Sequence, residues 1–412
     1  NGFDMAFPTE PLLLGLMMLV IFNIIYRFNL FKKIIKHPIV TILILYLIWM
    51  CVTCVTSTIP ATSFKLFLTR LWYILPLFFL GVFFLKEKGQ FLNFTLCYTL
   101  PFSFVILYTT VKHSLHFFDK QSAHYMMSPF FNDHTSYGAM IAFFIPLLIA
   151  ALYSNKKNPF LKVVILGLIL LFFVGFVLSF SRAAWISLIC AIFVSLLVRL
   201  KLSIKSLASF GVLLFISAFL LQSTILTQLS NNRQDSSDNL IEHFTSLSNI
   251  STDASNMERI NRWQCAIDMF KERPFFGWGP GTYQFQYAPF QFSSNRTIIS
   301  SNDGDAGNAH SEYLSVLSES GILGLVFFIT LLIIVLIRIV ILYNTLHDEE
   351  IKLWLLAILT SLVSYFVHGF FNNFLDTDKA SVAIWLVISI IVSIDLANNK
   401  NKFTNKFDDN FS

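Results

Sequence analysis

Arg182 stands near the middle of an otherwise uncharged apolar run, VVILGLILLFFVGFVLSFSRAAWISLICAIFVSLLV, at residues 163–198. At the centre of a bilayer an arginine costs about 2.5–3.5 kcal/mol or more, so the run either folds back near Arg182 or supplies a partner for the charge. A guanidinium keeps its proton, and its planar fork of donors suits phosphate groups. Arg70, in KLFLTRLWYILP, is a second arginine near the end of an apolar stretch. Snorkelling toward lipid headgroups is the alternative explanation for both arginines.

The polar stretch SNMERINRWQCAIDMFKERP, residues 255–274, carries three further arginines, two of them in its first half. Its apolar residues recur at helical spacing: Ile260, Trp263, Ile267 and Phe270. The spacing predicts an amphipathic helix that lies on the protein or on the membrane surface and stops at Pro274. Arg259 and Arg262 fall off this apolar stripe, so a solvated polar face is the plain explanation for them. A functional alternative is that they contribute to an anion site.

His310 follows the loop SNDGDAGNA, and we expect a helix to begin near Asn308–Ala309 with His310 in its first turn. The positive end of a helix and nearby arginines both disfavour imidazolium. His310 would therefore be neutral at physiological pH, as a general base must be, although a lone histidine is more often structural. Asp303 and Asp305 could hold a cation, but two carboxylates in a glycine-rich loop are more often turn residues.

The composition shows which elements must position these side chains. Of 412 residues, 55% are hydrophobic and only 13% are charged, whereas soluble domains carry about 25% charge. The chain is therefore predicted to be an all-α polytopic membrane protein, and its net charge of +5 requires no nucleic-acid partner. Eleven apolar windows are long enough to span a bilayer: 11–26, 38–57, 66–85, 91–111, 135–153, 160–180, 183–199, 206–224, 321–342, 352–371 and 380–396.

The distribution of basic residues predicts the orientation. Of the 29 lysines and arginines, 17 fall on one set of short connections and on the C-terminal tail, and six fall on the opposite set. By the positive-inside rule the first set is cytoplasmic, so the segment 225–320 faces outward. The chain lacks an initiator methionine, and we predict a preceding crossing that would make twelve. The side alternation requires a turn at Ser179–Arg182, which places Arg182 at the outer membrane edge.

These windows divide the chain into four predicted parts. Residues 1–224 form an N-terminal transmembrane bundle of about eight helices, and 225–320 form one long outward-facing segment with amphipathic helices. Residues 321–396 form the C-terminal transmembrane helices, and 397–412 form a cytoplasmic tail.

Several motifs together resemble the O-antigen ligase and polymerase superfamily, which also includes bacterial protein O-oligosaccharyltransferases. They are SFSRAAW, RWQCAIDMFKERPFFGWGPGTYQ, AHSEYLSVLSESGILGL and HGFFNNFLDTDKASVAIWLV, in this order and on one predicted side. The resemblance, over roughly 130–396, implies a GT-C-like glycosyltransferase of the bacterial inner membrane that is active on the periplasmic side without a metal or cofactor. Its donor would be a glycan on undecaprenyl pyrophosphate, and the outward-facing segment 225–320 would be periplasmic and hold the donor and acceptor site.

The resemblance also assigns roles to residues. Arg182 and Arg262 match arginines that the family associates with the donor pyrophosphate, and His310 matches the histidine proposed to activate the acceptor. The family's usual Asn after that histidine is Ser311 here, which puts contacts of that amide in doubt. Arg70, as a third pyrophosphate ligand, and Asn373 are weaker additions from location.

Three acceptors are compatible with the resemblance: the lipid A core, another glycan chain and a protein hydroxyl. We favour the first, O-antigen ligation in lipopolysaccharide biosynthesis, because the single long outer segment lies late in the chain and carries the arginine and histidine motifs. A lipid-linked glycan transporter is the alternative of another class. Transporters place ionisable groups near the membrane midplane, whereas the candidates here gather at one predicted edge.

Overall fold

The computed structural model describes residues 9–155, 158–201, 254–291 and 307–408, and every regular element in these ranges is helical. Nine helices in the described ranges are long and apolar enough to span a membrane, if α4, η1 and α5 are taken as one. They are α3 (Pro38–Val55), α4–η1–α5 (Pro60–Tyr73, Ile74–Phe78 and Phe79–Phe84), α6 (Lys88–Ser114), α8 (His134–Ser154), α9 (Pro159–Leu178), α10 (Arg182–Arg199), α15 (Glu312–Thr345), α16 (Glu349–His368) and α17 (Asp378–Asp408).

The shorter helices complete the described chain. α1 (Thr9–Tyr26) and α2 (Phe28–Ile35) meet at a bend of 102° and together would make a tenth span. Ten of the eleven predicted windows thus correspond to helices, and the window 206–224 lies outside the described residues. The remaining elements are α7 (Lys120–Ala123), α13 (Ala254–Glu272), α14 (Tyr283–Gln286) and η2 (Ala288–Phe290).

The apolar run that contains Arg182 folds back on itself, as predicted. α9 ends at Leu178 and α10 begins at Arg182. Phe180 between them has a left-handed backbone, with φ of 48°, and its N–H donates to the Val177 carbonyl. Arg182 therefore stands at a helix end and not in the middle of a span.

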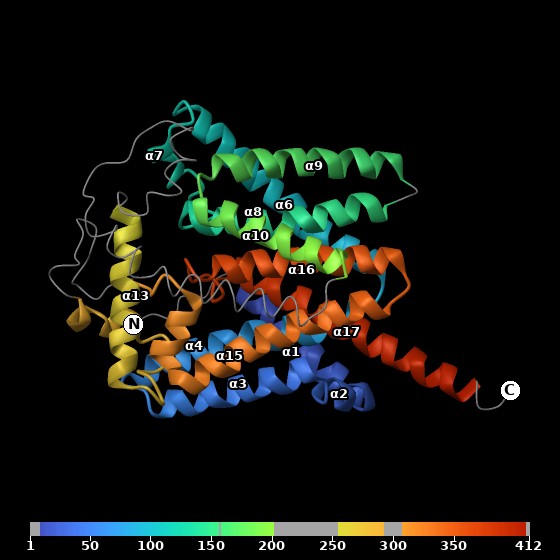
Figure 1. The fold of residues 1–412 in the computed structure, drawn as a ribbon, viewed down its shortest axis with the longest axis horizontal. Helices are drawn as coiled ribbons and strands as arrows, with labels where there is room; N and C mark the ends of the chain where they lie inside the picture. Colours follow the sequence, from blue (N-terminus) through green and yellow to red (C-terminus); the bar gives the residue numbers. More distant parts are fainter. Residues whose placement is uncertain (1–8, 156–157, 202–253, 292–306, 409–412) are drawn as a thin grey trace.

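α16 lies between α8 and α10 and runs antiparallel to both (Figure 1). Hydroxyl side chains mark the close contacts: the oxygens of Ser195 and Thr360 are 2.7 Å apart, and Ser361 Oγ donates to the Phe143 carbonyl at 2.6 Å. Small residues allow helices to approach closely where lipid offers no hydrophobic drive. Because of the antiparallel order, α8 and α10 begin beside the residue where α16 ends.

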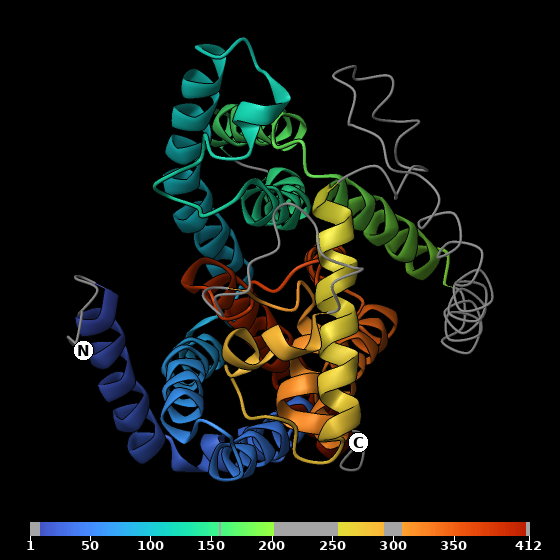
Figure 2. The same cartoon turned by 90° about the vertical axis from the view of Figure 1, so that its left-hand side faces the viewer.

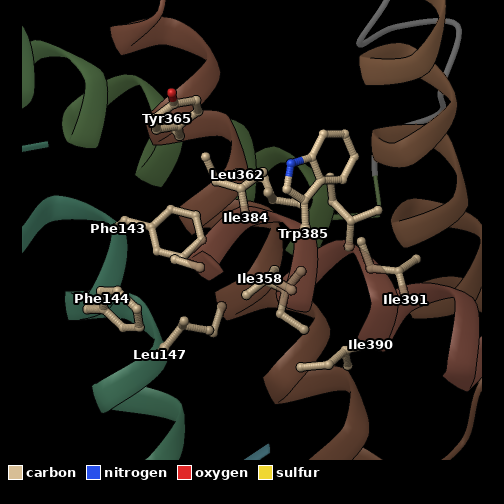
Figure 3. Close-up of a cluster of buried hydrophobic side chains, with 14 of the residues drawn as sticks. Phe143, Phe144, Leu147, Ile358, Leu362, Tyr365, Ile384, Trp385, Ile390 and Ile391 are labelled. Carbon is tan, nitrogen blue, oxygen red and sulfur yellow. The ribbon is translucent and has the colours of Figure 1, made fainter. Parts of the chain in front are cut away.

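Large apolar side chains from α8, α16 and α17 meet in one buried cluster (Figure 3). The neighbouring half of the bundle contains α3 and α15 (Figure 1), and α5 packs against α17. There α17 lies so close to α5 that a Cβ on Gly81 would overlap Ser389. This packing holds the middle of α17 against α5.

α15 is broken at Gly321, where φ is 67° and ψ is −170°. The loop after α13 fits into the break: the N–H of Ile322 donates to the Pro274 carbonyl at 2.9 Å, and a Cβ on Gly321 would overlap the carbonyl of Phe275. The predicted crossing 321–342 begins at this break. The segment from Glu312 to Ser320 precedes it as a separate helical piece.

α13 lies across one end of the bundle, at a large angle to the long helices (Figures 1 and 2). Its packing partner is the first part of α15. We refer to the end of the bundle where α8, α10 and α15 begin as the site end.

Candidate functional site

α13 buries a different face from the one predicted. The buried residues are Glu258, Asn261, Arg262, Cys265, Ala266 and Met269, whereas the predicted stripe from Ile260 to Phe270 is only half-buried. The physical reason is a cluster contributed by residues far along the chain, Trp278, Tyr283 and Tyr287, against which Cys265 and Met269 pack. Arg262 therefore does not belong to a solvated polar face.

The Arg262 side chain is 6% exposed and is held from three sides. Its Nε donates to Glu258 Oε1 at 2.7 Å, and its guanidinium carbon lies 3.9 Å from the ring centre of Tyr287. Gly307 covers the third side so closely that a Cβ there would overlap the guanidinium. In the described ranges no acceptor reaches Nη1. A buried donor without an acceptor is costly, so Nη1 marks a position that an anion could occupy.

Arg262 keeps its positive charge in spite of its burial. Burial acts to lower the pKa of this guanidinium, but the hydrogen bond to Glu258 and the adjacent Tyr287 raise the pKa above its usual value. Tyr283 fixes the backbone at this point, because its hydroxyl donates to the Arg262 carbonyl at 2.8 Å.

His310 lies before the helix and not within its first turn. α15 begins at Glu312, and Ser311 is its N-cap, whose hydroxyl accepts from the N–H of Leu314. The prediction of a start near Asn308–Ala309 was wrong, because the Asn308 side chain instead accepts from the N–H of His310 at 2.9 Å in a turn. Ser and Asn are both strong N-cap residues, so Ser311 retains the cap that an asparagine would make.

The imidazole of His310 is neutral at physiological pH, as predicted, but for a different leading reason. Burial lowers its pKa to about 4, with the positive charges of Arg259 and Arg262 adding to the effect and Glu258 and Asp133 opposing it. The His310 backbone is left-handed, with φ of 48°, and Trp263 Nε1 donates to its carbonyl at 3.1 Å. α13 thus fixes the position of His310, and its two arginines add to the effect of burial on the pKa.

His368, the last residue of α16, belongs to the same surroundings and is not among the site residues predicted from the sequence. It is 1% exposed and accepts at Nε2 from the side-chain amide of Asn372 at 3.0 Å. Arg259 and Asp133 are electrostatic neighbours of both His368 and His310. The sequence does contain a feature that could have identified His368, because this residue begins the HGFFNN motif at the end of a predicted crossing.

Arg182 reaches this end of the bundle through the N-terminus of α10. It is half-buried, and Ser181 before it caps the helix by accepting from the N–H of Ala184. The backbone of Ala183 lies next to the imidazole of His368. The structure therefore gathers Arg259, Arg262 and His310, and Arg182 is the residue next to Ala183, whose backbone lies beside His368. A place for the Arg182 side chain in the same site stays a prediction.

Arg70 and Asn373 hold the loop between α16 and α17. Arg70 makes a two-pronged ion pair with Asp376, Nε to Oδ1 at 2.6 Å and Nη2 to Oδ2 at 2.8 Å, and its Nη1 donates to the Tyr46 hydroxyl. Asn373 Nδ2 donates to Ser315 Oγ at 2.8 Å. These partners give both residues a structural task, and their part in donor binding stays a prediction.

Glu312 ties the same loop to the start of α15. Its backbone N–H donates to the Gly369 carbonyl at 2.8 Å, and its Oε1 accepts from the N–H groups of Phe374 and Leu375, each at 2.7 Å. The loop therefore forms part of the wall next to His310.

Among the described residues no three His, Cys, Asp or Glu side chains come together to hold a metal ion. Asp303 and Asp305, the carboxylates considered as an alternative, lie outside the described residues.

Residues 166–329 match a family model described as O-antigen ligase. The match includes four of the six candidate site residues: Arg182, Arg259, Arg262 and His310. A comparison with curated proteins gives no match.

Proposed function

We propose that this chain, whose residues 166–329 match a family model described as O-antigen ligase, transfers a glycan en bloc from undecaprenyl pyrophosphate to an acceptor hydroxyl at the periplasmic membrane face. The proposal is carried by one observation: a half-buried, neutral histidine lies beside two arginines of α13, one of which has an N–H without an acceptor in the described ranges. A cationic pocket beside a base is what displacement of a diphosphate by a hydroxyl requires.

The arginines act on the leaving group. Arg182, Arg259 and Arg262 bind the pyrophosphate and stabilise the negative charge that grows on it as the bond to the sugar breaks. The buried guanidinium of Arg262 is already oriented by Glu258 and Tyr287, so it needs little reorganisation during the reaction. Since pyrophosphate is a good leaving group, charge stabilisation by this chain's own residues is sufficient, and we propose that transfer needs no metal ion.

His310 acts on the acceptor. Its neutral imidazole takes the proton of the attacking hydroxyl as the acceptor oxygen bonds to the anomeric carbon. The bond between that carbon and the phosphate oxygen breaks, and undecaprenyl pyrophosphate departs with the electron pair. The proton on His310 then passes to solvent or to the departing diphosphate, which restores the base.

The first test is transfer by purified protein in detergent, with donor and acceptor but no sealed compartment, in the presence of EDTA. Product formation excludes pure transport, and strict dependence on added Mg²⁺ or Mn²⁺ would overturn metal independence. We expect Arg262→Ala and His310→Ala each to lower the rate by about 10²–10⁴-fold. Lys271→Ala is the control on the same helix, because the Lys271 side chain is 64% exposed. An active His310→Ala protein removes the assigned base.

The acceptor proposed is the lipid A core, because the long outer segment is single, lies late in the chain and carries the arginine and histidine motifs. Deletion of the gene followed by electrophoresis of lipopolysaccharide tests this. Loss of all long chains with accumulation of free polymer is the expected result. Caps of a single repeat would instead indicate a polymerase, and unchanged lipopolysaccharide would indicate a protein acceptor.

A further inference from the structure

The turn that follows α6 displays apolar side chains that the fold leaves uncovered. Leu115 is 75% exposed and Phe117 is 94% exposed. Phe118 packs on one side against the imidazole of His113, with ring centres 5.4 Å apart, and is exposed on the other. In Figure 2, which faces the site end, this part of the chain (teal) lies at the edge of the bundle, away from α13. We refer to residues 115–118 as the aromatic turn.

The backbone of the aromatic turn is well defined and strained. Its φ angles are 52° at Phe117 and 56° at Phe118, in the left-handed region that glycine usually occupies at the end of a helix. The N–H of Phe118 donates to the His113 carbonyl at 3.1 Å, and His113 Nε2 donates to the Asp119 carbonyl at 2.7 Å. A bulky residue is costly in this conformation. Since Phe117 gains almost no packing within the fold, a contact outside the fold must compensate for that cost.

The aromatic turn continues the lipid-facing side of α6. Phe104, Leu107 and Val111 are exposed on this membrane-length helix, at intervals of three and four residues that define one face. Leu115 follows at the next interval of four. Apolar residues that are exposed on a spanning helix face lipid, so the same solvent extends along this face to Leu115 and Phe117.

The length of α6 places the aromatic turn at the surface of the bilayer. α6 has 27 residues, which extend about 40 Å. A bilayer is about 30 Å thick in its hydrocarbon core and about 40–45 Å thick with its headgroup regions, so the end of α6 lies among the headgroups. Lys112 and Lys120 flank the turn. At this level a lysine keeps its stem on apolar surface and extends its ammonium group to the lipid phosphates.

We propose that the aromatic turn inserts into the bilayer at the boundary between headgroups and acyl chains. Phe117 lies in the acyl region, and Lys112 and Lys120 lie at the phosphates. The partner is the phospholipid of the leaflet that surrounds the site end. This inference is independent of the proposed function, because it uses only the shape, the exposure and the position of the turn.

The inserted turn packs against the turn that leads into Arg182. His113 lies between the two, since its ring centre is 5.4 Å from that of Phe118 and 6.1 Å from that of Phe180. Phe180 is two residues before Arg182. A lipid contact at Phe117 therefore supports, through His113, the turn that precedes Arg182.

The test uses the full chain in nanodiscs of phosphatidylethanolamine and phosphatidylglycerol. Phe117→p-benzoyl-phenylalanine introduces a photocrosslinking side chain at a position where there is little packing to disturb. After irradiation, we expect mass spectrometry to find phospholipid attached to the peptide that contains this position. Crosslinking to a second copy of the chain, or to another part of the same chain, in place of phospholipid would overturn the proposal.

Two further variants carry the same reporter and give reference yields. Phe104→p-benzoyl-phenylalanine places it within the spanning part of α6, where Phe104 is 72% exposed, and should yield the phospholipid adduct. Phe285→p-benzoyl-phenylalanine places it on α14, outside the spanning helices, where Phe285 is 48% exposed. We expect the yield at Phe117 to approach that at Phe104 and to exceed that at Phe285 several-fold. Equal yields at Phe117 and Phe285 contradict insertion of the aromatic turn.

Discussion

The contact between Gly307 and Arg262 determines where the arginine points. An alanine at 307 would overlap the guanidinium and push it out of its place between Glu258 and Tyr287. We expect Gly307→Ala to lower kcat/KM by about 10²-fold, since a misplacement of about 1 Å can have that effect, with little change in thermal stability. Gly167→Ala is the control, because a Cβ at Gly167 meets nothing within 4 Å. Equal activity of the two variants would show that Arg262 need not be held in place.

The pKa of His310 gives a second residue-scale prediction. In the free protein this pKa is about 4, so the imidazole is neutral above that pH and the acid limb of kcat/KM should lie near pH 4 and not near 6.5. Bound diphosphate adds negative charge among the same arginines, which raises the pKa of His310 in the complex. The acid limb of kcat should therefore lie at higher pH than that of kcat/KM. Coincident limbs in the two pH–rate profiles would mean that His310 does not face the diphosphate.

The sequence identified Arg262 and His310 as candidate functional residues, but it did not predict which residues surround them. Arg262 and His310 were selected because a cation and a neutral imidazole have recognisable chemistry. The face of α13 could not be chosen from its own periodicity, because Tyr283 and Tyr287, which bury Arg262, lie some twenty residues further on. His368 was missed because its link to Arg259 joins two elements that are distant in the chain.

At the scale of elements, the break in α15 depends on a single glycine. Gly321 combines a left-handed backbone with close contact to the Phe275 carbonyl. A side chain there costs about 1–2 kcal/mol for the backbone alone and would also displace the loop that joins α13 to the bundle. We expect Gly321→Ala to lower the midpoint of thermal unfolding in detergent relative to Gly167→Ala. An unchanged midpoint would show that the loop can leave the break without loss of stability.

The long elements were predictable and their ends were not. Apolar windows locate spans because any bilayer-crossing helix needs about 20 apolar residues. The start of α15 was predicted three to four residues too early, although Ser311 followed by Glu312 is an N-terminal signal. The break at Gly321 falls inside a continuous helical pattern, and only the loop from Pro274 explains it.

For the molecule as a whole, the basic residues predict which end faces outward. A cysteine at Lys271, on α13, should react with an impermeant maleimide in intact cells. A cysteine at Lys33, on α2, should react only after permeabilisation, since 17 of the 29 basic residues share its predicted side. Both positions are solvent-exposed in the fold, so detergent-solubilised protein should label at both. The opposite pattern in cells would invert the topology and place the candidate site in the cytoplasm.

The hydrogen bond from Glu312 to Gly369 and the closeness of Asp133 to His310 have a consequence for chimeric proteins. Both partners lie outside residues 166–329, the stretch that matches the family model. A hybrid that exchanges only this stretch between two relatives would take His310 from one protein. The residues at positions 133 and 369, which contact this region, would come from the other. The unit that can be exchanged with its chemistry intact must extend at least from the start of α8 to the start of α17.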